Sequence, residues 1–394
     1  MSNTATDFPK SPLALGSTLG VIGGGQLGKM FVQAAQTLGF KTVVLEPSDN
    51  SCAGAVAHQH IQASYTDPQG LAQLAAACDA ITTEFENVPA DSLRVLGQIR
   101  PVHPDFRAVS VAQDRALEKQ LFTASGIACA PYAVIASSAD AQNAKPSLFP
   151  AILKTATLGY DGKGQVTVNA AADLPTAWAN LGGVRCVLEQ KLALAYEISV
   201  IVARGADGTL ANLPVQQNLH RSGILAFTQV PAPDVSAELG AQAIAAARAI
   251  AVQLAYVGVL CVEFFVLTDG ALVVNEIAPR PHNSGHYSIE ACDVSQYDLQ
   301  VRTLSGLPLA QPRLMQAAVM INLMGDLWFD AQGRAREPNW GAVLSLSGAA
   351  LHLYGKLDAK PARKMGHITV IADTFIQAKS QAALCCAALG IHPL

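Results

Sequence analysis

The sequence predicts a mixed α/β and α+β protein of two or three domains, and three observations lead to this prediction. Between residues 18 and 46, a short apolar strand, a glycine-rich turn, a helix and a second strand follow one another. Apolar segments of strand length dominate residues 131–202. Two further apolar runs flank Asp269-Gly270, a pair typical of a tight turn between antiparallel strands.

Composition restricts the class of protein. The chain has 394 residues, of which 51% are hydrophobic and 14% charged, which indicates a compact globular protein. A net charge of −4 argues against general binding to nucleic acid or to a membrane surface, although a local basic pocket remains compatible with it. The 8 cysteines form no C-x-x-C pair, so we expect a reducing cytoplasm. Residues 1–17 are expected to be a loose tail without signal-peptide character, and no segment resembles a membrane span.

The first folded segment carries a glycine-rich phosphate-binding pattern. A strand at residues 18–22 leads into GGGQLG (residues 23–28), a helix, a strand at residues 41–45 and then Glu46. This order satisfies the dinucleotide-binding fingerprint, in which glycines admit a phosphate to a helix N-terminus. An NAD(P)-dependent dehydrogenase is therefore one interpretation.

The alternation continues with a helix at residues 71–78 and a strand at residues 80–83, which ends at Glu84. Ligands of open α/β sheets bind beyond the carboxyl ends of the strands, so we expect Gln26 and Glu84 to line one crevice. From the residues alone, Glu84 could equally be a solvated loop carboxylate. Residues 102–104 end this unit.

A second unit combines a helix, several strands and a mobile loop. Residues 105–125 look helical, with Arg115, Glu118 and Lys119 on a charged face, and strands are expected at residues 132–135, 151–154, 164–168, 184–189 and 197–202. The loop 159–164 contains three glycines whose amides could close over phosphates, with Lys154 as counter-charge. The turn after residue 188 could present backbone groups to a base edge. Glu197 could hold ribose hydroxyls, or it could form an ion pair at a sheet edge.

The hairpin that follows a helix at residues 236–254 carries two glutamates. If its strands, 259–267 and 271–277, are joined by a two-residue loop, Glu263 lies directly opposite Glu276. Like charges at this spacing are destabilising and call for a cation, for which oxygen ligands favour Mg²⁺. A three-residue Thr-Asp-Gly loop would instead shift the register and separate the two glutamates. Just beyond the hairpin, polar residues crowd a loop: Arg280, His282, Asn283 and His286.

The C-terminal part is expected to form a smaller, β-rich unit. After a helix at residues 296–304, strands are expected at residues 317–323, 350–354 and 367–372, a helical turn at 341–345 and a helix at 376–389. Basic residues concentrate at Lys356, Lys360, Arg363 and Lys364. Such a run is either a solvated face or a clasp for a phosphate.

The order of the motifs GGGQLG, TEFENVP, LKTATLGYDGKGQ, LEQ, VEFF…VVNEIAPRPHNSGH and KPARKMGH resembles the ATP-grasp superfamily, and within it the 5-(carboxyamino)imidazole ribonucleotide synthase family. The resemblance covers residues 18–375 and implies ATP-grasp architecture. We expect a Rossmann-like domain over residues 18–104, an ATP-grasp domain over 105–310 with a mobile lid near 131–202, and a small β-rich domain over 311–394. Members of the family are usually homodimers.

The resemblance also implies the reaction. ATP, bicarbonate and 5-aminoimidazole ribonucleotide are the expected substrates in purine biosynthesis, with Mg²⁺ or, as an alternative, Mn²⁺ as the metal. Bicarbonate is expected to attack the γ-phosphate and give carboxyphosphate, which then carboxylates the exocyclic amine. Closure of the glycine loop should protect carboxyphosphate from water.

Roles are carried over by motif position. The implied metal ligands are Glu263 and Glu276. The implied ATP contacts are Arg115, Lys154, Gly159, Tyr160, Asp161, Gly162, Lys163, Gly164, Gln165, Glu189, Gln190, Lys191, Leu192, Glu197, His220, Asn275 and Glu276. The implied substrate contacts are Gln26, Leu27, Glu84, Arg280, His282, Asn283, Lys356, Arg363 and Lys364, and the implied catalytic residues are Tyr160, Asp161, Arg280, His282 and Asn283. Relatives commonly carry arginine at Lys163, and lysine lacks its bidentate geometry.

Other functions remain as alternatives. Formate-dependent glycinamide ribonucleotide transformylase is a similar ATP-grasp enzyme, but its pattern has Glu at the position of Gln26 and Asp at that of Asn283. A non-catalytic ATP-binding regulator is disfavoured by the complete set of glutamates, lysine and lid. Asp161 and His282 are both candidates for the residue that takes the amine proton.

Overall fold

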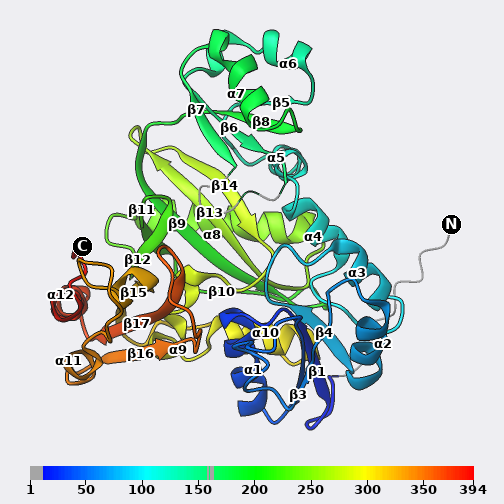
Figure 1. The fold of residues 1–394 in the computed structure, drawn as a ribbon, viewed down its shortest axis with the longest axis vertical. Coiled ribbons are helices and arrows are strands. Elements are labelled where there is room, and N and C mark those ends of the chain that lie inside the picture. Colours follow the sequence, from blue (N-terminus) through cyan, green and yellow to red (C-terminus); the bar gives the residue numbers. More distant parts are fainter. Residues whose placement is uncertain (1–11, 158, 160–163) are drawn as a thin grey trace.

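The computed structural model describes residues 12–157, 159 and 164–394. The predictions at Tyr160, Asp161, Gly162 and Lys163 therefore lie outside the described residues. A long central sheet is flanked by the N-terminal unit and by a small green unit at the top of the view, and the orange C-terminal strands continue it at one end (Figure 1).

The N-terminal unit is a parallel sheet of four strands in the order β3-β2-β1-β4, as expected for the Rossmann-like pattern. Its first core cluster joins Leu19 and Val21 of the sheet with Phe31 of the first helix, and Tyr297 and Val301 of a later helix pack against them. The elements are β1 (Thr18–Ile22), α1 (Gln26–Thr37), β2 (Lys41–Leu45), β3 (Gln59–Ile61), α2 (Pro68–Ala77), β4 (Ala80–Thr83) and α3 (Ala90–Leu96).

Two helices, not one, occupy residues 105–125: α4 (Phe106–Ala112) and α5 (Arg115–Ala124). The helix breaks at Asp114, whose side chain accepts the backbone N–H groups of Ala116 and Leu117 and so caps α5. The predicted charged face is wrong for two of its residues, because Glu118 is 3% and Lys119 1% exposed.

The small unit at the top of Figure 1 is an antiparallel sheet in the order β5-β8-β6-β7, with two helices beside it. Lys154 lies opposite Gln165 in the β6–β7 ladder, so the glycine loop begins where this pairing ends. The elements are β5 (Tyr132–Ile135), α6 (Ser138–Gln142), η1 (Pro146–Leu148), β6 (Ala151–Thr155), β7 (Gln165–Val168), η2 (Ala171–Asp173), α7 (Leu174–Asn180) and β8 (Cys186–Gln190).

A nine-stranded antiparallel sheet forms the centre, in the order β14-β13-β9-β11-β12-β15-β17-β16, with β10 beside β9. Pairing of β12 with β15 makes the C-terminal strands part of this sheet. The first half comprises β9 (Leu194–Arg204), β10 (Leu210–Asn212), β11 (Gln216–Arg221), β12 (Ile224–Val230), α8 (Ala237–Gln253), β13 (Gly258–Leu267), β14 (Leu272–Ala278), η3 (Asn283–Gly285), α9 (Ser288–Ala291) and α10 (Gln296–Ser305). The second half comprises β15 (Ala317–Met324), η4 (Gly325–Trp328), α11 (Trp340–Leu344), β16 (Ala349–Leu353), β17 (Lys364–Ala372) and α12 (Phe375–Leu389).

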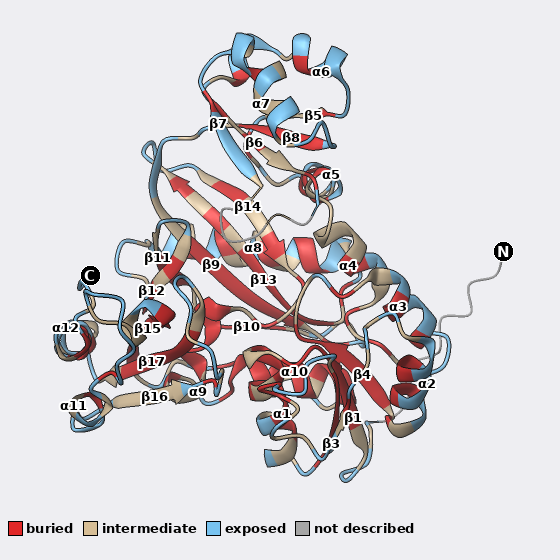
Figure 2. Ribbon diagram, viewed as in Figure 1, coloured by how far each residue is buried: buried red, intermediate tan, exposed pale blue. Residues whose placement is uncertain are grey.

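Helices cover the central sheet and make its strands buried (Figure 2). On one face, Ala247 and Ile250 of α8 pack against Val202 and Leu260, and on the other Leu299 of α10 packs against Ile201. α12 buries the C-terminal strands in a separate cluster. None of the helices in the described part of the chain combines the length and apolar character that a membrane span requires.

Candidate active site

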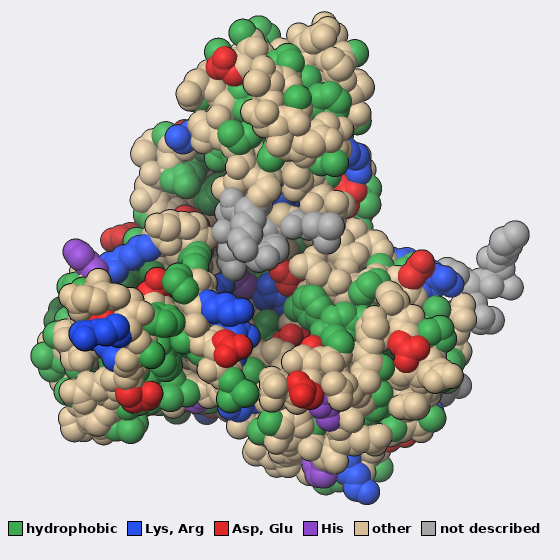
Figure 3. Space-filling model, viewed as in Figure 1, with side chains coloured by type: hydrophobic (Ala, Val, Ile, Leu, Met, Phe, Trp, Pro, Cys, Tyr) green, Lys and Arg blue, Asp and Glu red, His purple; other side chains and the backbone are tan. Residues whose placement is uncertain are grey.

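A cleft of about 890 Å³ opens between the N-terminal unit, the small antiparallel unit and the central sheet. Figure 3 shows a hollow near the centre of the molecule, with Lys, Arg, Asp and Glu side chains at its edges. Ligand clefts commonly fall in this range of volume. Eighteen residues from the sequence-predicted site line it: Gln26, Leu27, Glu84, Arg115, Lys154, Gly159, Gln165, Glu197, His220, Glu263, Asn275, Glu276, Arg280, His282, Asn283, Lys356, Arg363 and Lys364.

The β13–β14 hairpin presents Glu263 opposite Glu276, as predicted, but the reason given for the pairing was wrong. The N–H of Leu267 donates to Ala271 O at 2.9 Å, so the turn has the three-residue Thr-Asp-Gly loop. The register shifts by one between Glu263 and Phe264, which leaves Asn275 as the extra residue of a β-bulge. The bulge compensates for the longer loop and brings the two glutamates back into register.

Basic groups from outside the hairpin contact both glutamates. His282 Nε2 lies 2.9 Å from Glu263 Oε1, and Arg115 Nη1 lies 3.2 Å from Glu276 Oε2. Burial alone would raise the pKa of Glu263, but His282 and His220 outweigh it and lower the pKa to about 2. Glu263 is therefore ionised at neutral pH. Its oxygen also lies within 4.8 Å of ligand atoms of Glu197 and His220.

Lys119 is the most informative residue that the sequence analysis did not place in the site. Its Nζ lies 3.4 Å from Glu189 Oε2 and donates to Asn275 O, the bulge residue, at 3.0 Å. Lys154 Nζ also bonds Glu189 Oε2, at 3.0 Å, and the two lysines lower the pKa of Glu189 although burial opposes this. A signal was available, since Lys119 is three residues from both Ala116 and Phe122 and so shares their buried helix face.

The carboxylate of Glu118, next to Lys119, is also buried in the site wall. Its Oε1 accepts the backbone N–H of Ile277 at 2.7 Å, one residue beyond Glu276. Burial, with the negative charge of Glu276 adding to it, raises the pKa of Glu118 to about 8. Helix α5 thus fixes the backbone of β14 on both sides of Glu276.

A second pair of functional groups lies on the β9 and β11 strands. His220 Nδ1 lies 2.9 Å from Glu197 Oε2. Burial lowers the pKa of His220, but the contact with Glu197 outweighs it and the pKa is raised. A β-bulge between Leu219 and His220 redirects the strand at this point, which is a common device beside active sites.

The N-terminal glycine turn is occupied by carboxylates of the protein itself. Gly25 N and Gly28 N donate to the two oxygens of Glu84, each at 2.9 Å, and Gly24 N donates to Glu46 at 2.9 Å. Glu84 is 8% exposed, so the solvated interpretation is wrong. Because these amides already donate to carboxyl oxygens of the protein, the turn does not present them to a dinucleotide pyrophosphate, and the dehydrogenase interpretation loses its basis.

Two basic segments complete the wall of the cleft. Arg280 Nε pairs with Glu86 Oε2 at 2.5 Å, and although burial opposes it, Arg280 lowers the pKa of Glu86 to about 2. Glu86 lines the cleft and belongs to the TEFENVP motif. Only Glu84 of this motif was predicted from the sequence as a site residue. In the C-terminal loop, Lys356 Nζ donates to Lys364 O at 2.7 Å, and burial, followed by the charge of Arg363, lowers its pKa to about 8.

Three protein-family models match the chain. They are the Ribonucleotide synthetase preATP-grasp domain over residues 16–113, the ATP-grasp domain over 120–297 and the Phosphoribosylaminoimidazole carboxylase C-terminal domain over 318–381. The chain is 42% identical over 365 residues to N5-carboxyaminoimidazole ribonucleotide synthase of Staphylococcus aureus (strain COL), which covers 92% of this chain and 94% of that protein. The chain belongs to the N5-carboxyaminoimidazole ribonucleotide synthase family.

Solved structures of the N5-carboxyaminoimidazole ribonucleotide synthase family share the fold. The Staphylococcus aureus synthetase complexed with ADP has a TM-score of 0.87 at 39% identity, covering 96% of this chain and 98% of that one. The Aspergillus clavatus synthase in complex with ADP and 5-aminoimidazole ribonucleotide has a TM-score of 0.86 at 30% identity, covering 95% and 99%. The motif resemblance and the mixed α/β fold class with ATP-grasp architecture are both confirmed.

Some residues predicted for the site of this family member stand outside the cleft lining. Glu189 contacts the ammonium group of the cleft residue Lys154. The side-chain amide of Gln190 donates to Ser147 O at 3.3 Å. Among the described residues, the others that do not line the cleft are Gly164, Lys191 and Leu192. The backbone N–H of Lys191 donates to Pro150 O at 2.9 Å, so this segment is tied to the small sheet.

The last histidines of the motifs NEIAPRPHNSGH and KPARKMGH meet inside the protein. The rings of His286 and His367 lie 4.6 Å apart, and His367 stacks on His352 at 4.4 Å. Burial lowers the pKa of His286 and of His367, so both imidazoles are neutral. The hydroxyl groups of Tyr297 and Tyr354 then donate to Nδ1 of His286 and of His367, respectively, each at 3.0 Å. This packing joins the loop with Arg280 and Asn283 to the strand that begins at Lys364.

Proposed function

We propose that this chain carboxylates 5-aminoimidazole ribonucleotide with ATP and bicarbonate, and releases 5-(carboxyamino)imidazole ribonucleotide, ADP and phosphate. The observation that carries the proposal is the single cleft in which the paired glutamates, Lys154 and the C-terminal basic loop face one another. The names of the relatives support the same reaction, and one solved relative holds ADP and 5-aminoimidazole ribonucleotide.

In the first step, a bicarbonate oxygen attacks the γ-phosphorus of ATP, and the bond to the bridging oxygen of ADP breaks. Phosphoryl transfer needs positioning and charge neutralisation more than covalent help from the protein. Lys154 and Arg115 are the cations that we assign to the phosphates, because both line the cleft and each is held in place by a carboxylate, Glu189 and Glu276 respectively. Glu189, buried behind Lys154, holds that ammonium in place.

The residues present fit a divalent cation. Glu263 and Glu276 offer hard oxygen donors from adjoining strands, and Glu263 is ionised at neutral pH because His282 and His220 outweigh its burial and lower its pKa to about 2. When bound, Mg²⁺ or Mn²⁺ neutralises phosphate charge. We assign Asn275 a positioning role, since it is the bulge residue that lets Glu276 face Glu263.

In the second step, the exocyclic amine attacks the carboxyl carbon of carboxyphosphate, or of the CO₂ that it releases, phosphate departs and the amine loses a proton. We assign the ribonucleotide to Gln26, Glu84 and the loop from Arg280 to Asn283, with its 5′-phosphate at Arg363 and Lys364. Asn283 supports this assignment, because its side chain is 7% exposed and both its amide N and O lack a partner among the described residues. Such a group is ready to bond a ligand in the cleft.

The test is ADP release with each substrate omitted in turn. We expect turnover only when ATP, 5-aminoimidazole ribonucleotide and bicarbonate are all present. Turnover with formate and glycinamide ribonucleotide instead would identify the transformylase. A thermal-shift titration separates the dehydrogenase, because Mg-ATP should raise the unfolding temperature and NAD(H) should not.

The resemblance to the family also supports a homodimer. Light scattering after size-exclusion chromatography should give a mass twice that of the chain, and a monomer mass at micromolar concentration contradicts this part of the proposal.

A further inference from the structure

Arg221 follows His220 in β11 but makes its contacts outside the cleft. Its guanidinium donates to the backbone oxygens of His392 and Pro393, at 2.5 and 2.6 Å. The guanidinium carbon also lies 5.0 Å from the centre of the Phe227 ring. One side chain therefore connects the last residues of the sequence to the strand that carries His220.

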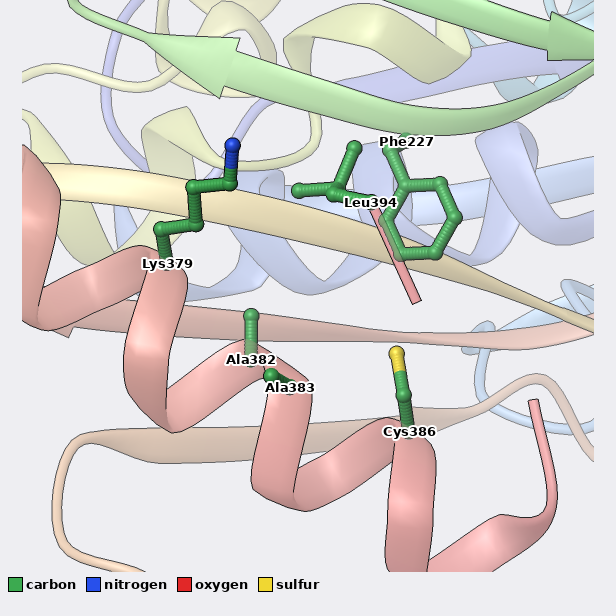
Figure 4. Close-up of a pocket in the computed structure, with 6 residues that line it drawn as sticks. All are labelled: Phe227, Lys379, Ala382, Ala383, Cys386 and Leu394. Carbon is green, nitrogen blue, oxygen red and sulfur yellow. The ribbon is translucent and has the colours of Figure 1, made fainter. Parts of the chain in front are cut away.

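Those last residues are seated on the C-terminal core. Ile391 N donates to Cys386 O at 2.8 Å, and the side chains of Ile391 and Leu394 pack against the cluster that contains Phe227. Figure 4 shows Leu394 beside Phe227, above Ala382, Ala383 and Cys386 of α12. The pocket between them is only about 30 Å³, so the tail fills this surface and leaves no room for a substrate.

The β11–β12 hairpin extends beyond its neighbours in the sheet at this point. The pairing of β11 with β9 ends at Asn218, and that of β12 with β15 ends at Phe227. Ser222 and Gly223 at the tip have φ of 51° and 77°, the left-handed turn region. The inner side of the tip lines the cleft through His220, Gly223, Ile224 and Leu225. The tip thus depends on contacts outside the main ladders to keep its position.

We propose that residues 391–394 form a latch that, through Arg221, fixes the hairpin tip and so positions His220 for ATP. Arg221 is a positioning residue, and the inference rests on the ATP contact that the family resemblance implies for His220. A hairpin held in its binding geometry does not lose conformational freedom when ATP binds. Release of the latch should therefore raise the KM for ATP by about threefold to tenfold while kcat and the KM for the ribonucleotide change little.

The experiment compares three latch variants of the 394-residue chain: Arg221→Gln, Arg221→Lys and deletion of residues 392–394. We expect Arg221→Gln and the deletion to raise the KM for ATP to a similar extent, and their combination to add little, because both remove one interaction. Arg221→Lys should recover part of the affinity, since lysine keeps the charge but cannot fork to two carbonyls. Hydrogen exchange at residues 219–226 should become faster in the same variants. Arg313→Gln, which alters an exposed ion pair with Asp293, is the matched control.

The deletion also removes Leu394 from the core, so Arg221→Gln, which leaves the tail intact, decides the question. An unchanged KM for ATP in folded Arg221→Gln overturns the latch. An equal change in both KM values and kcat also overturns it, because it indicates general destabilisation. His220→Ala separates the two proposals: if it leaves the KM for ATP unchanged, the assigned nucleotide site is wrong, and if it raises the KM when Arg221→Gln does not, only the latch fails.

Discussion

Replacing Lys119 by Met tests whether a buried ammonium maintains the cleft. Its side chain is 1% exposed, and its Nζ contacts Glu189 Oε2 at 3.4 Å and Asn275 O at 3.0 Å. Methionine has a similar length but no donor. The substitution leaves the carbonyl of the bulge residue without this bond and leaves Glu189 with Lys154 as its remaining cation.

The cost follows from these contacts. Removing one partner of a buried ion pair typically destabilises a protein by about 3–5 kcal/mol. Entropy changes of roughly 2 cal/mol/K per residue, applied to the 394 residues, convert about 4 kcal/mol into a fall in Tm of about 5 °C. The KM for ATP should rise as well, because Lys154 and Glu276 both lose support. Differential scanning calorimetry and initial-rate kinetics measure the two effects.

Lys41→Met is the matched control, since Lys41 is exposed at the start of β2, away from the cleft. Exposed substitutions of this kind usually change stability by less than about 0.5 kcal/mol. If Lys119→Met melts within 1 °C of the unmodified chain while Lys41→Met behaves as expected, the reasoning about the buried ion network is refuted.

Three more predictions follow from the site. Glu276→Gln should abolish ADP release at saturating Mg²⁺, and unchanged turnover would remove the metal assignment. Arg363→Ala should raise the KM for the ribonucleotide far more than that for ATP; an effect on ATP alone would show that the basic loop has been misassigned. Burial lowers the pKa of His286 and His367 well below its usual range, so only the unfolded chain takes up these protons below about pH 6.5. The stability of the folded chain that these neutral histidines allow is therefore fully present above about pH 6.5. It is lost as the pH falls, by at most about 1.4 kcal/mol per pH unit for each histidine. The free energy of unfolding, measured by urea denaturation, should therefore fall less steeply with falling pH in His367→Phe than in the unmodified chain. Equal slopes would contradict the prediction.

Local patterns predicted most of the elements in this chain. The strands Thr18–Ile22, Lys41–Leu45, Ala80–Thr83 and Tyr132–Ile135 begin and end where apolar runs indicated. Pairing between distant strands was not predicted, because no local signal specifies it. The ladder between β12 and β15, which makes one sheet from strands on both sides of α8, α9 and α10, is such a case.

The same contrast between local and long-range signals applies to the residues of the site. Motif positions brought Glu84, Arg280 and Arg363 to one cleft without any knowledge of the fold. Their partners could not be found by motif alone, since the Arg280–Glu86 pair spans 194 residues and the Lys119–Asn275 bond spans 156. In both cases the missed residue is charged, and its role becomes visible only when the partner's position is known.

The glutamate pair shows why a correct prediction can rest on a wrong step. A two-residue loop was the simplest way to set Glu263 opposite Glu276, yet Gly270, with φ of 86°, closes a three-residue loop that alone would misalign them. The bulge at Asn275 restores the alignment, and Lys119 holds the carbonyl of that residue. Register at the carboxylates is therefore set by helix α5 as well as by the turn. It follows that deleting Thr268 should leave catalysis largely intact, because Leu267 would still face Ala271 across a two-residue Asp-Gly loop and the bulge would still set Glu263 opposite Glu276.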